Sequence, residues 1–249
     1  MKLLALDTAT DWCSVALWNA GELRVREAQA ERGHGGHLLA MVEELLCESG
    51  LALTALDAIA FGRGPGAFTG LRLAASVTQG LAYAAGIGAI PVSDLRAIAQ
   101  RALTVPAPSQ VLVCHDARMG EVYWAGFETV GGYAGAATPE AVARPEQMIE
   151  AARAWLSAGG GAAAGPSGSA GVPAAAGAGS GFAAHPVLAA ELAPSLAFIH
   201  PGLGPHAREI AALAVHDGMG SAVPPEQALP VYVRNNVAVV PIARRVNIS

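Results

Sequence analysis

Residues 61–72, Phe-Gly-Arg-Gly-Pro-Gly-Ala-Phe-Thr-Gly-Leu-Arg, decide the fold, because they place four glycines between an apolar run and a helical pattern. Ala58–Phe61 is predicted to be a buried strand, and Leu71–Ala85 a helix that ends at Gly86. Glycines at such a junction can let backbone N–H groups approach an anion, or they can serve only a tight reversal of the chain. The spacing is not the G-x-G-x-x-G of dinucleotide-binding folds, because an alanine and a threonine interrupt it.

The segments on either side of this loop predict a mixed sheet. Three short runs with turn residues between them indicate a meander of strands at Leu3–Leu6, Cys13–Trp18 and Glu22–Ala28. The spacing of apolar residues predicts a helix over His37–Ser49. After the loop, a strand at Ala89–Val92 precedes a helix over Asp94–Leu103, with Ser93 as its N-cap. Strand–helix alternation after a meander is typical of an α/β lobe.

The remaining chain predicts a second, smaller lobe. The proline-containing stretch Thr104–Ser109 marks the boundary, so we expect lobes at 1–105 and 106–249. Residues 157–184 are nearly all Gly, Ala, Ser and Pro, which predicts a flexible surface excursion with little to bury and room for one strand. The other expected elements are strands at Gln110–Cys114 and Glu121–Phe127 and helices at Pro145–Leu156 and Pro205–His216.

Composition excludes several classes of protein. The chain has 249 residues, of which 53% are hydrophobic and 14% charged, so it is not disordered. A net charge of −5 argues against a protein that grips nucleic acid or an anionic membrane by itself. Lys2 is the only lysine, which excludes a Walker-type loop, a kinase-type clamp and a Schiff base. The three cysteines are far apart in the sequence, which is typical of a reducing compartment. The opening apolar run reaches Asp7 too early for a signal peptide. We therefore expect a cytoplasmic protein.

Two segments are candidates for chemistry. Asp7, Thr8 and Thr10 follow the first strand and can hold hydrated Mg²⁺ and phosphate oxygens, or Asp7 can cap its own backbone in an Asx-type turn. Together with the glycine-rich loop they form the predicted phosphate- or nucleotide-binding set: Asp7, Thr8, Thr10, Gly62, Gly64, Gly66, Thr69 and Gly70. Asp116, Arg118 and Glu121 indicate a charged hairpin bend with a local ion pair.

No catalytic or metal-ligating residue is predicted. His34 and His37 lack a third ligand and the H-E-x-x-H arrangement of hydrolytic zinc sites. The chain also has no G-x-S-x-G elbow.

Four segments together resemble one family. They are residues 4–17, the loop at 61–72, the run Asp-Ala-Arg-Met-Gly-Glu-Val-Tyr at 116–123, and Pro-Val-Tyr-Val-Arg-Asn-Asn-Val-Ala at 230–238. The chain is similar to the bacterial TsaB (YeaZ) family, whose members are accessory subunits of the machinery that makes N6-threonylcarbamoyladenosine in tRNA. The resemblance runs from Met1 to about Ala238 and is weakest across 157–205.

The resemblance implies an actin-like, sugar-kinase-like ATPase fold with a ribonuclease-H-like motif and two related lobes. It implies a non-catalytic scaffold that needs no cofactor and pairs with a TsaD-like paralogue and a TsaE-like ATPase. These partners would bind ATP or ADP and metal. The chain would contact tRNA only as part of the complex. Alone, the chain is expected to form a homodimer. Two other functions are weighed against this one: an independent ATP-dependent phosphotransferase of the same fold, and a glycoprotease-like metallopeptidase, which the missing ligand set disfavours.

The partner is expected to dock on the first two helices. The helix over Leu71–Ala85 has no continuous polar face, and a helix that is apolar nearly all round is normally buried. The predicted interface residues are Leu38, Met41, Val42, Leu45, Gly70, Ala74, Val77, Leu81 and Ala84. The alternative is that the C-terminal segment covers this face within the same chain, with Pro205–His216 as the first candidate.

Overall fold

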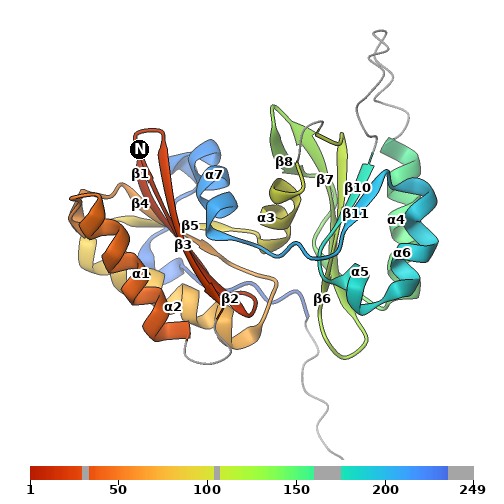
Figure 1. Ribbon diagram of the computed structural model, residues 1–249, viewed down its shortest axis with the longest axis horizontal. Helices are drawn as coiled ribbons and strands as arrows, with labels where there is room; N and C mark the ends of the chain where they lie inside the picture. The colour runs from red at the N-terminus through yellow and green to blue at the C-terminus, as the bar shows by residue number, and fades with distance from the viewer. Residues whose placement is uncertain (30–33, 104–106, 160–174, 235–249) are drawn as a thin grey trace, which may run out of the picture.

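A computed structural model describes residues 1–29, 34–103, 107–159 and 175–234. Two lobes lie side by side, each built around one sheet, as Figure 1 shows. Three predictions fall partly outside the described residues: the boundary at 104–109, the excursion at 157–184 and the family segment at 230–238. No helix within the described residues is long and apolar enough to cross a membrane.

The first lobe holds the predicted meander and the strand–helix alternation. Within the described residues its sheet has the order β3-β2-β1-β4-β5. The first three strands pair antiparallel, and β4 and β5 run parallel to β1. The predicted strands are confirmed, with ends that differ by no more than one residue: β1 Lys2–Asp7, β2 Trp12–Asn19, β3 Glu22–Gln29, β4 Ala58–Gly62 and β5 Gly88–Val92.

Both faces of this sheet are covered, which explains the unbroken apolar run in β1. Leu4 and Leu6 pack in a cluster with α1 (His34–Glu48) and α2 (Phe68–Ala85). Leu3 and Ala5 point to the opposite face, where α7 (Ala207–Asp217) covers them. The helix expected at Pro205–His216 therefore exists, but it packs on the first sheet although it lies beyond residue 106. The expected second lobe at 106–249 includes α7, but in the structure α7 packs on the first lobe.

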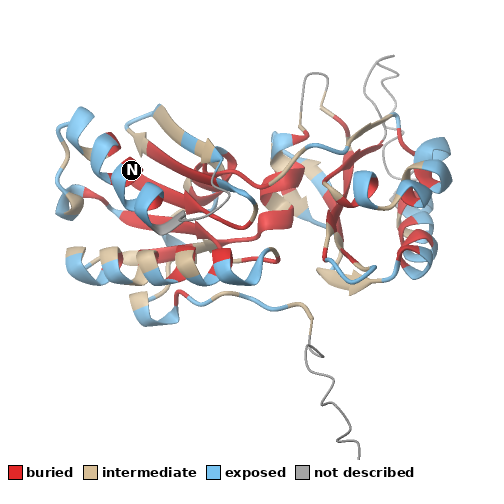
Figure 2. Cartoon of the chain, turned by 60° about the horizontal axis from the view of Figure 1, so that its bottom comes forward, coloured by how far each residue is buried: buried red, intermediate tan, exposed pale blue. Residues whose placement is uncertain are grey.

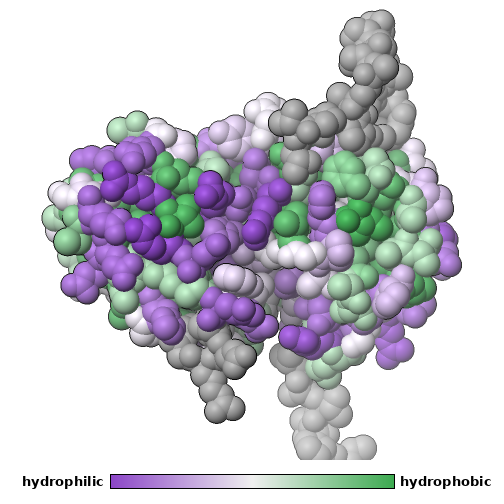
Figure 3. Space-filling view, viewed as in Figure 1, coloured by the Kyte–Doolittle hydropathy of each residue, from purple (hydrophilic) through white to green (hydrophobic). Residues whose placement is uncertain are grey.

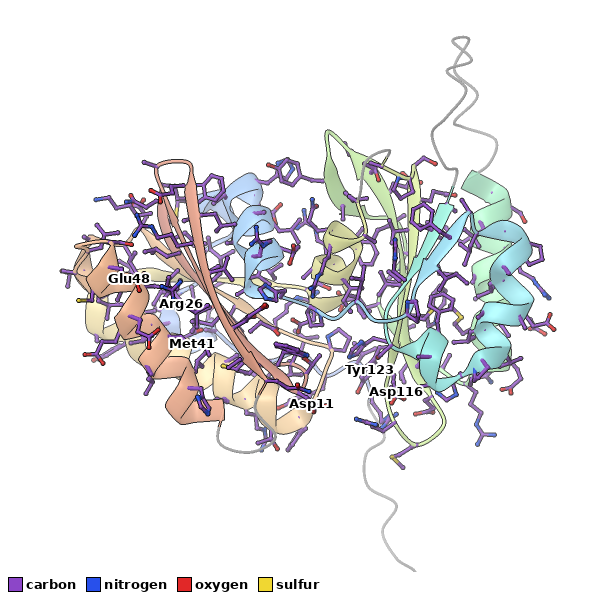
Figure 4. All side chains as sticks on the ribbon, viewed as in Figure 1. Asp11, Arg26, Met41, Glu48, Asp116 and Tyr123 are labelled. Carbon is purple, nitrogen blue, oxygen red and sulfur yellow. The ribbon has the colours of Figure 1, made fainter. Side chains whose placement is uncertain are left out.

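The helices of the first lobe begin earlier than predicted. α1 begins at His34 instead of His37, and α2 begins at Phe68 instead of Leu71, while Gly86 ends α2 in a left-handed conformation as expected. Glu48 of α1 forms an ion pair with Arg26 of β3, in which Nη2 of Arg26 lies 2.5 Å from Oε1 of Glu48 (Figure 4). This contact joins the end of α1 to the edge strand.

The second lobe repeats the strand order of the first. Its sheet runs β11-β10-β6-β7-β8 within the described residues, and β9 also pairs with β7. Helices α4 and α6 lie on its outer side (Figure 1). The elements of this lobe are β6 Gln110–Asp116, β7 Val122–Val130, β8 Tyr133–Ala136, β9 Ala141–Ala143, α4 Pro145–Gly159, β10 Ala175–Ala178, α5 Gly181–Ala184, α6 Pro186–Leu192 and β11 Phe198–His200.

Strand β10 corrects the expectation that residues 157–184 bury little. It pairs with β6 on one side and β11 on the other, and Ala175, Ala176 and Ala178 are buried. A Cβ at Gly177 would lie 2.9 Å from the Phe182 ring and 3.0 Å from a Leu196 methyl group. Small residues fit here because the neighbouring side chains fill the space that β10 leaves.

Helix α3 (Asp94–Arg101) lies between the two lobes, and burial concentrates in this helix and in the two sheets (Figure 2). Leu95 and Ile98 pack against the second sheet, and Ala97 packs against the first. The helix begins as predicted, with Oγ of Ser93 accepting a hydrogen bond from the backbone N–H of Arg96. Because each face of α3 belongs to a different core, the helix fixes one lobe against the other.

Candidate functional site

The first candidate site lies where β1, β4 and β5 end, at one edge of the first sheet. Asp7 is the last residue of β1, and Asp94 follows β5 as the first residue of α3. Their exposed fractions are 1% and 0%. Both carboxyl groups lie over Gly62, where a Cβ would collide with them. The fold thus places two carboxyl groups together in the interior.

These two carboxyl groups form a coupled pair. Burial, and then the neighbouring charge of Asp7, raise the pKa of Asp94 well above its usual range, while a hydrogen bond from Gly64 and the charge of Arg63 oppose the shift. The N–H of Gly64 donates to Oδ2 of Asp94 at 2.5 Å, and the N–H of Asp94 donates to the carbonyl of Gly64 at 3.0 Å. Two buried carboxyl groups in contact favour holding a proton between them. The two hydrogen bonds between Gly64 and Asp94 hold the glycine-rich loop to the start of α3.

The same loop packs directly on the bend after β1. The Oγ1 of Thr8 donates to the carbonyl of Gly70 at 2.7 Å, and the N–H of Ala67 donates to the carbonyl of Ala9 at 2.9 Å. A Cβ at Gly70 would overlap the carbonyl of Thr8, and one at Gly66 would lie 2.8 Å from Cβ of Ala9. Glycine is required here because two backbone segments touch.

This packing encloses most of the predicted phosphate-binding set. The structure brings the predicted residues together, but it buries Asp7, Thr8, Gly62, Gly64 and Gly70. Thr10 and Gly66 are half-buried, and Thr69 is exposed. A phosphate would meet two carboxyl groups and a threonine hydroxyl that already donates its proton. Of the two explanations for the glycines, close packing accounts for the geometry.

Asp94 is the residue that sequence reasoning missed. Asp94 follows the N-cap Ser93 directly, and acidic residues are common in the first turn of a helix, so its position alone does not indicate a site. A signal exists in the order of the strands: parallel strands β1, β4 and β5 end at the same edge, so acidic residues after β1 and β5 can meet there. Only the pairing of β4 between them establishes this.

The second candidate site is the bend between β6 and β7. Asp116 ends β6, and Tyr123 lies near the start of β7 at the same end of the sheet (Figure 4). The predicted local pair is confirmed, with Nη1 of Arg118 3.4 Å from Oδ2 of Asp116. The Arg118 side chain is 83% exposed, so this pair contributes little. Arg118 and Met119 both have positive φ, 60° and 57°, which is costly for residues with a side chain.

Arg234 closes this bend from the C-terminal segment, a contact that sequence reasoning missed. Its Nη2 lies 2.5 Å from Oε2 of Glu121 and donates to the carbonyl of Ala117 at 3.1 Å. The Arg234 side chain is 15% exposed. Because Arg234 and Glu121 are more than a hundred residues apart, no local pattern relates them.

Behind the bend, His115 is buried against the start of α5. The hydroxyl of Ser180 accepts from the N–H of Asp116 at 3.1 Å and lies within hydrogen-bond distance, 3.0 Å, of Nδ1 of His115. Burial lowers the pKa of His115 to about 4, with the charge of Asp116 opposing the shift. The imidazole is therefore neutral near pH 7 and ties β6 to α5.

Helices α1 and α2 turn most of the predicted partner surface toward the sheet. Six of its residues are buried: Leu38, Met41, Val42, Leu45, Gly70 and Ala74. An apolar stripe at helical spacing marks the face that packs on the lobe's own core, so these six are not free to meet a partner. Val77 and Leu81 are half-buried, and Ala84 is exposed. Beside them lie Leu39 and Tyr83, which are 49% and 82% exposed.

The C-terminal segment, and not α7, covers part of α2 within the chain. Nε2 of Gln79 donates to the carbonyl of Ala228 at 3.1 Å, and Nε of Arg72 donates to the hydroxyl of Tyr232 at 3.0 Å. Ala75 packs in one cluster with Ala228. The alternative that the C-terminal segment covers part of this face is thus confirmed for residues 228–232. Its suggested helix, Pro205–His216, is not the covering part, because α7 lies on the other side of the sheet.

Comparisons with known proteins agree with this architecture. The family model described as "TsaD: tRNA N6-adenosine threonylcarbamoyltransferase" matches residues 26–194. The Escherichia coli protein named "tRNA threonylcarbamoyladenosine biosynthesis protein TsaB" is 39% identical over 247 residues, which cover 96% of each chain. The chain belongs to the TsaB (YeaZ) family. A Haemophilus influenzae protein of the same name is 48% identical over 124 residues, which are 50% of this chain and 52% of that protein.

The two-lobed fold is that of a solved TsaB-family relative. A crystal structure from Pseudomonas aeruginosa, described as similar to peptidase YeaZ, has a TM-score of 0.74 and 40% sequence identity. The match covers 94% of this chain and 99% of that one. The buried first bend and the surface-exposed second bend therefore occur in a chain of the TsaB family.

Proposed function

We propose that this chain is a non-catalytic subunit of a complex that transfers the threonylcarbamoyl group from threonylcarbamoyl-AMP to N6 of the adenosine next to the tRNA anticodon. Its relatives carry the name of tRNA threonylcarbamoyladenosine biosynthesis proteins. The matching family model carries the name of the transferase itself. The proposal gives catalysis and the metal to a TsaD-like paralogue, and ATP turnover to a TsaE-like ATPase.

The closed first bend is the observation that carries this proposal. Phosphotransferases need a carboxylate and backbone N–H groups that substrate can reach. Here Asp7 is buried with Asp94, and the backbone of Gly70 touches that of Thr8. The phosphotransferase alternative would require this packing to open. The geometry supports a structural role for the loop, in which it fixes α2 at one angle on the sheet.

The outer face of α1 and α2 is the proposed docking surface for the paralogue. Leu39 and Tyr83 expose large apolar area there, and Val77, Leu81 and Ala84 lie on the same two helices. Exposed apolar residues that gather on one face are typical of protein interfaces. A second copy of the chain would use this face when the paralogue is absent, because a two-fold pairing needs only one self-complementary surface.

The test reconstitutes threonylcarbamoyl transfer to tRNA from the paralogue, the ATPase and this chain. We expect transfer only when the chain is present, and no turnover by the chain alone with Mg²⁺ or Zn²⁺. Ala84→Glu should abolish copurification with the paralogue, whereas Ala151→Glu on α4, also at an exposed alanine, should not. Turnover of ATP or peptide by the chain alone at about 1 s⁻¹ or faster would overturn the non-catalytic role.

A further inference from the structure

A pocket of about 340 Å³ lies beside the beginning of α7. Its lining comes from three elements that are distant in sequence: β3, the end of α3 and the first turn of α7. The lining residues are Val25, Glu27, Arg101, His206, Arg208 and Glu209. Hydrophilic residues also gather between the two lobes on the face that Figure 3 shows. One lining residue is apolar and none is a phenylalanine, tyrosine or tryptophan.

Glu209 presents a buried acceptor to this pocket. The residue is 9% exposed, and its Oε2 has no hydrogen-bond partner among the described residues. The nearest candidate is Nδ1 of His206 at 4.0 Å. That nitrogen accepts a hydrogen bond from the N–H of Arg208 at 3.2 Å, so it has no proton to give. A buried carboxyl oxygen without a hydrogen-bond donor is costly. Burial raises the pKa of Glu209, while the charges of His206, Arg101 and Arg208 oppose the shift.

A second carboxyl group is held at the same pocket by the other side of the His206 ring. Because Nδ1 accepts from Arg208, the proton of the neutral ring sits on Nε2, which donates to Oε2 of Glu27 at 2.5 Å. The Glu27 side chain is 51% exposed. Two carboxyl groups, one buried and one open, therefore meet in this pocket.

Two guanidinium groups at the pocket have no carboxylate partner. Arg101 and Arg208 are exposed, and neither lies within ion-pair distance of a carboxylate in the part of the chain that the structure describes. Nη1 of Arg101 donates to the carbonyl of Gly204 at 3.3 Å, which leaves its other N–H groups available. The pocket thus offers guanidinium N–H groups that contact no carboxylate among the described residues, together with a buried carboxyl oxygen that has no donor there.

We propose that this pocket binds a small zwitterion of the α-amino acid type. Arg101 and Arg208 would hold the carboxylate, and Oε2 of Glu209, with Glu27 beside it, would accept from the ammonium group. A nucleotide fits less well, because the lining has no phenylalanine, tyrosine or tryptophan on which a base could stack, and the His206 side chain is only 8% exposed. The inference rests on these charges alone and does not depend on the proposed function.

The test is an NMR titration of the full chain with three molecules of similar size. L-Alanine carries both charges, ethylamine lacks the carboxylate, and propionate lacks the ammonium group. We expect saturable binding of alanine, and binding of the other two that is weaker by about tenfold or more, because each loses one charged contact. AMP serves as the nucleotide probe and should not compete.

Two variants and one control locate the site. Glu209→Gln and Arg208→Gln should each weaken alanine binding by about tenfold, while Arg153→Gln, at an exposed arginine on α4, should leave it unchanged. Arg208 is exposed, so its variant reports on binding even if Glu209→Gln disturbs folding. Equal affinity for all three molecules, no binding of alanine by about 10 mM, or competition by AMP would overturn the proposal.

Discussion

The bends after β1 and β6 occupy equivalent positions in the two lobes and have opposite environments. Each follows the middle strand of its sheet, at the point where that strand turns back into an antiparallel partner, and each begins with an aspartate. Asp7 is buried with Asp94 under the glycine-rich loop, whereas Asp116 is half-buried beside an exposed arginine. One bend has become part of the core, and the other remains at the surface.

The difference lies in what each bend meets. The first lobe places a glycine-rich loop after its fourth strand, and the absence of side chains at Gly66 and Gly70 lets this loop touch the bend. At the second bend, Gly120 has open space around it within the described residues, and the distant residues that reach the turn include Arg234 and Ser180. Repeated topology therefore does not imply a repeated site, because the site depends on segments outside the shared strands.

The largest expected effect comes from adding one methyl group at each bend. Gly70→Ala should destabilise the chain by about 3 kcal/mol or more, because the new Cβ overlaps the carbonyl of Thr8. Gly120→Ala should cost only about 1 kcal/mol, from its φ of +78°. Urea unfolding of each variant measures the difference.

A control in the same helix separates packing from helix propensity. Gly80 of α2 has nothing within 4 Å of its would-be Cβ, so Gly80→Ala should stabilise by about 0.5–1 kcal/mol. Equal losses at Gly70 and Gly120 would show that the first bend is not closed by contact.

The second effect is a pair of opposite pH dependences. The pKa of Asp94 is raised in the folded state, so its contribution to stability is full below about pH 4 and is lost as pH rises through the folded pKa. The pKa of His115 is lowered from 6.5 to about 4. Its contribution is present above pH 6.5 and is lost as pH falls toward 4, by up to about 3 kcal/mol.

Unfolding free energies of Asp94→Asn and His115→Gln measure both slopes. The parent-minus-variant difference should fall with rising pH above about pH 4 for Asp94→Asn, and should rise between pH 4 and 6.5 for His115→Gln. A flat difference for Asp94→Asn would contradict the protonated pair at the first bend.

The smallest effect concerns the ion pairs of the second bend. Arg234→Gln should destabilise by about 1–2 kcal/mol, because it leaves Glu121 and the carbonyl of Ala117 without their donor. Arg118→Gln should change stability by less than about 0.5 kcal/mol, since its side chain is 83% exposed. Amide hydrogen exchange at Ala117 and Glu121 should quicken only in the Arg234 variant. Equal exchange in the two variants would remove Arg234 as the group that closes this bend.

The sequence by itself determined the local elements and the class of fold. Apolar runs and helical spacing located the strands of the first lobe and the helix after the glycine-rich loop, because they depend on neighbours within a few residues. Gly86 and Ser93 marked a helix end and a helix start for the same reason. The motif at residues 61–72 also carried the family resemblance.

Tertiary structure alone decided what each element packs against. The apolar stripe with Leu38 and Leu45 packs on the lobe's own sheet and not on a partner. Helix α7 packs on the first lobe, and β10 is an internal strand of the second sheet. Tertiary structure also brought Asp94 beside Asp7. These contacts join residues that are far apart in the chain, and no spacing encodes them, because burial of a side chain depends on which distant surface arrives to cover it.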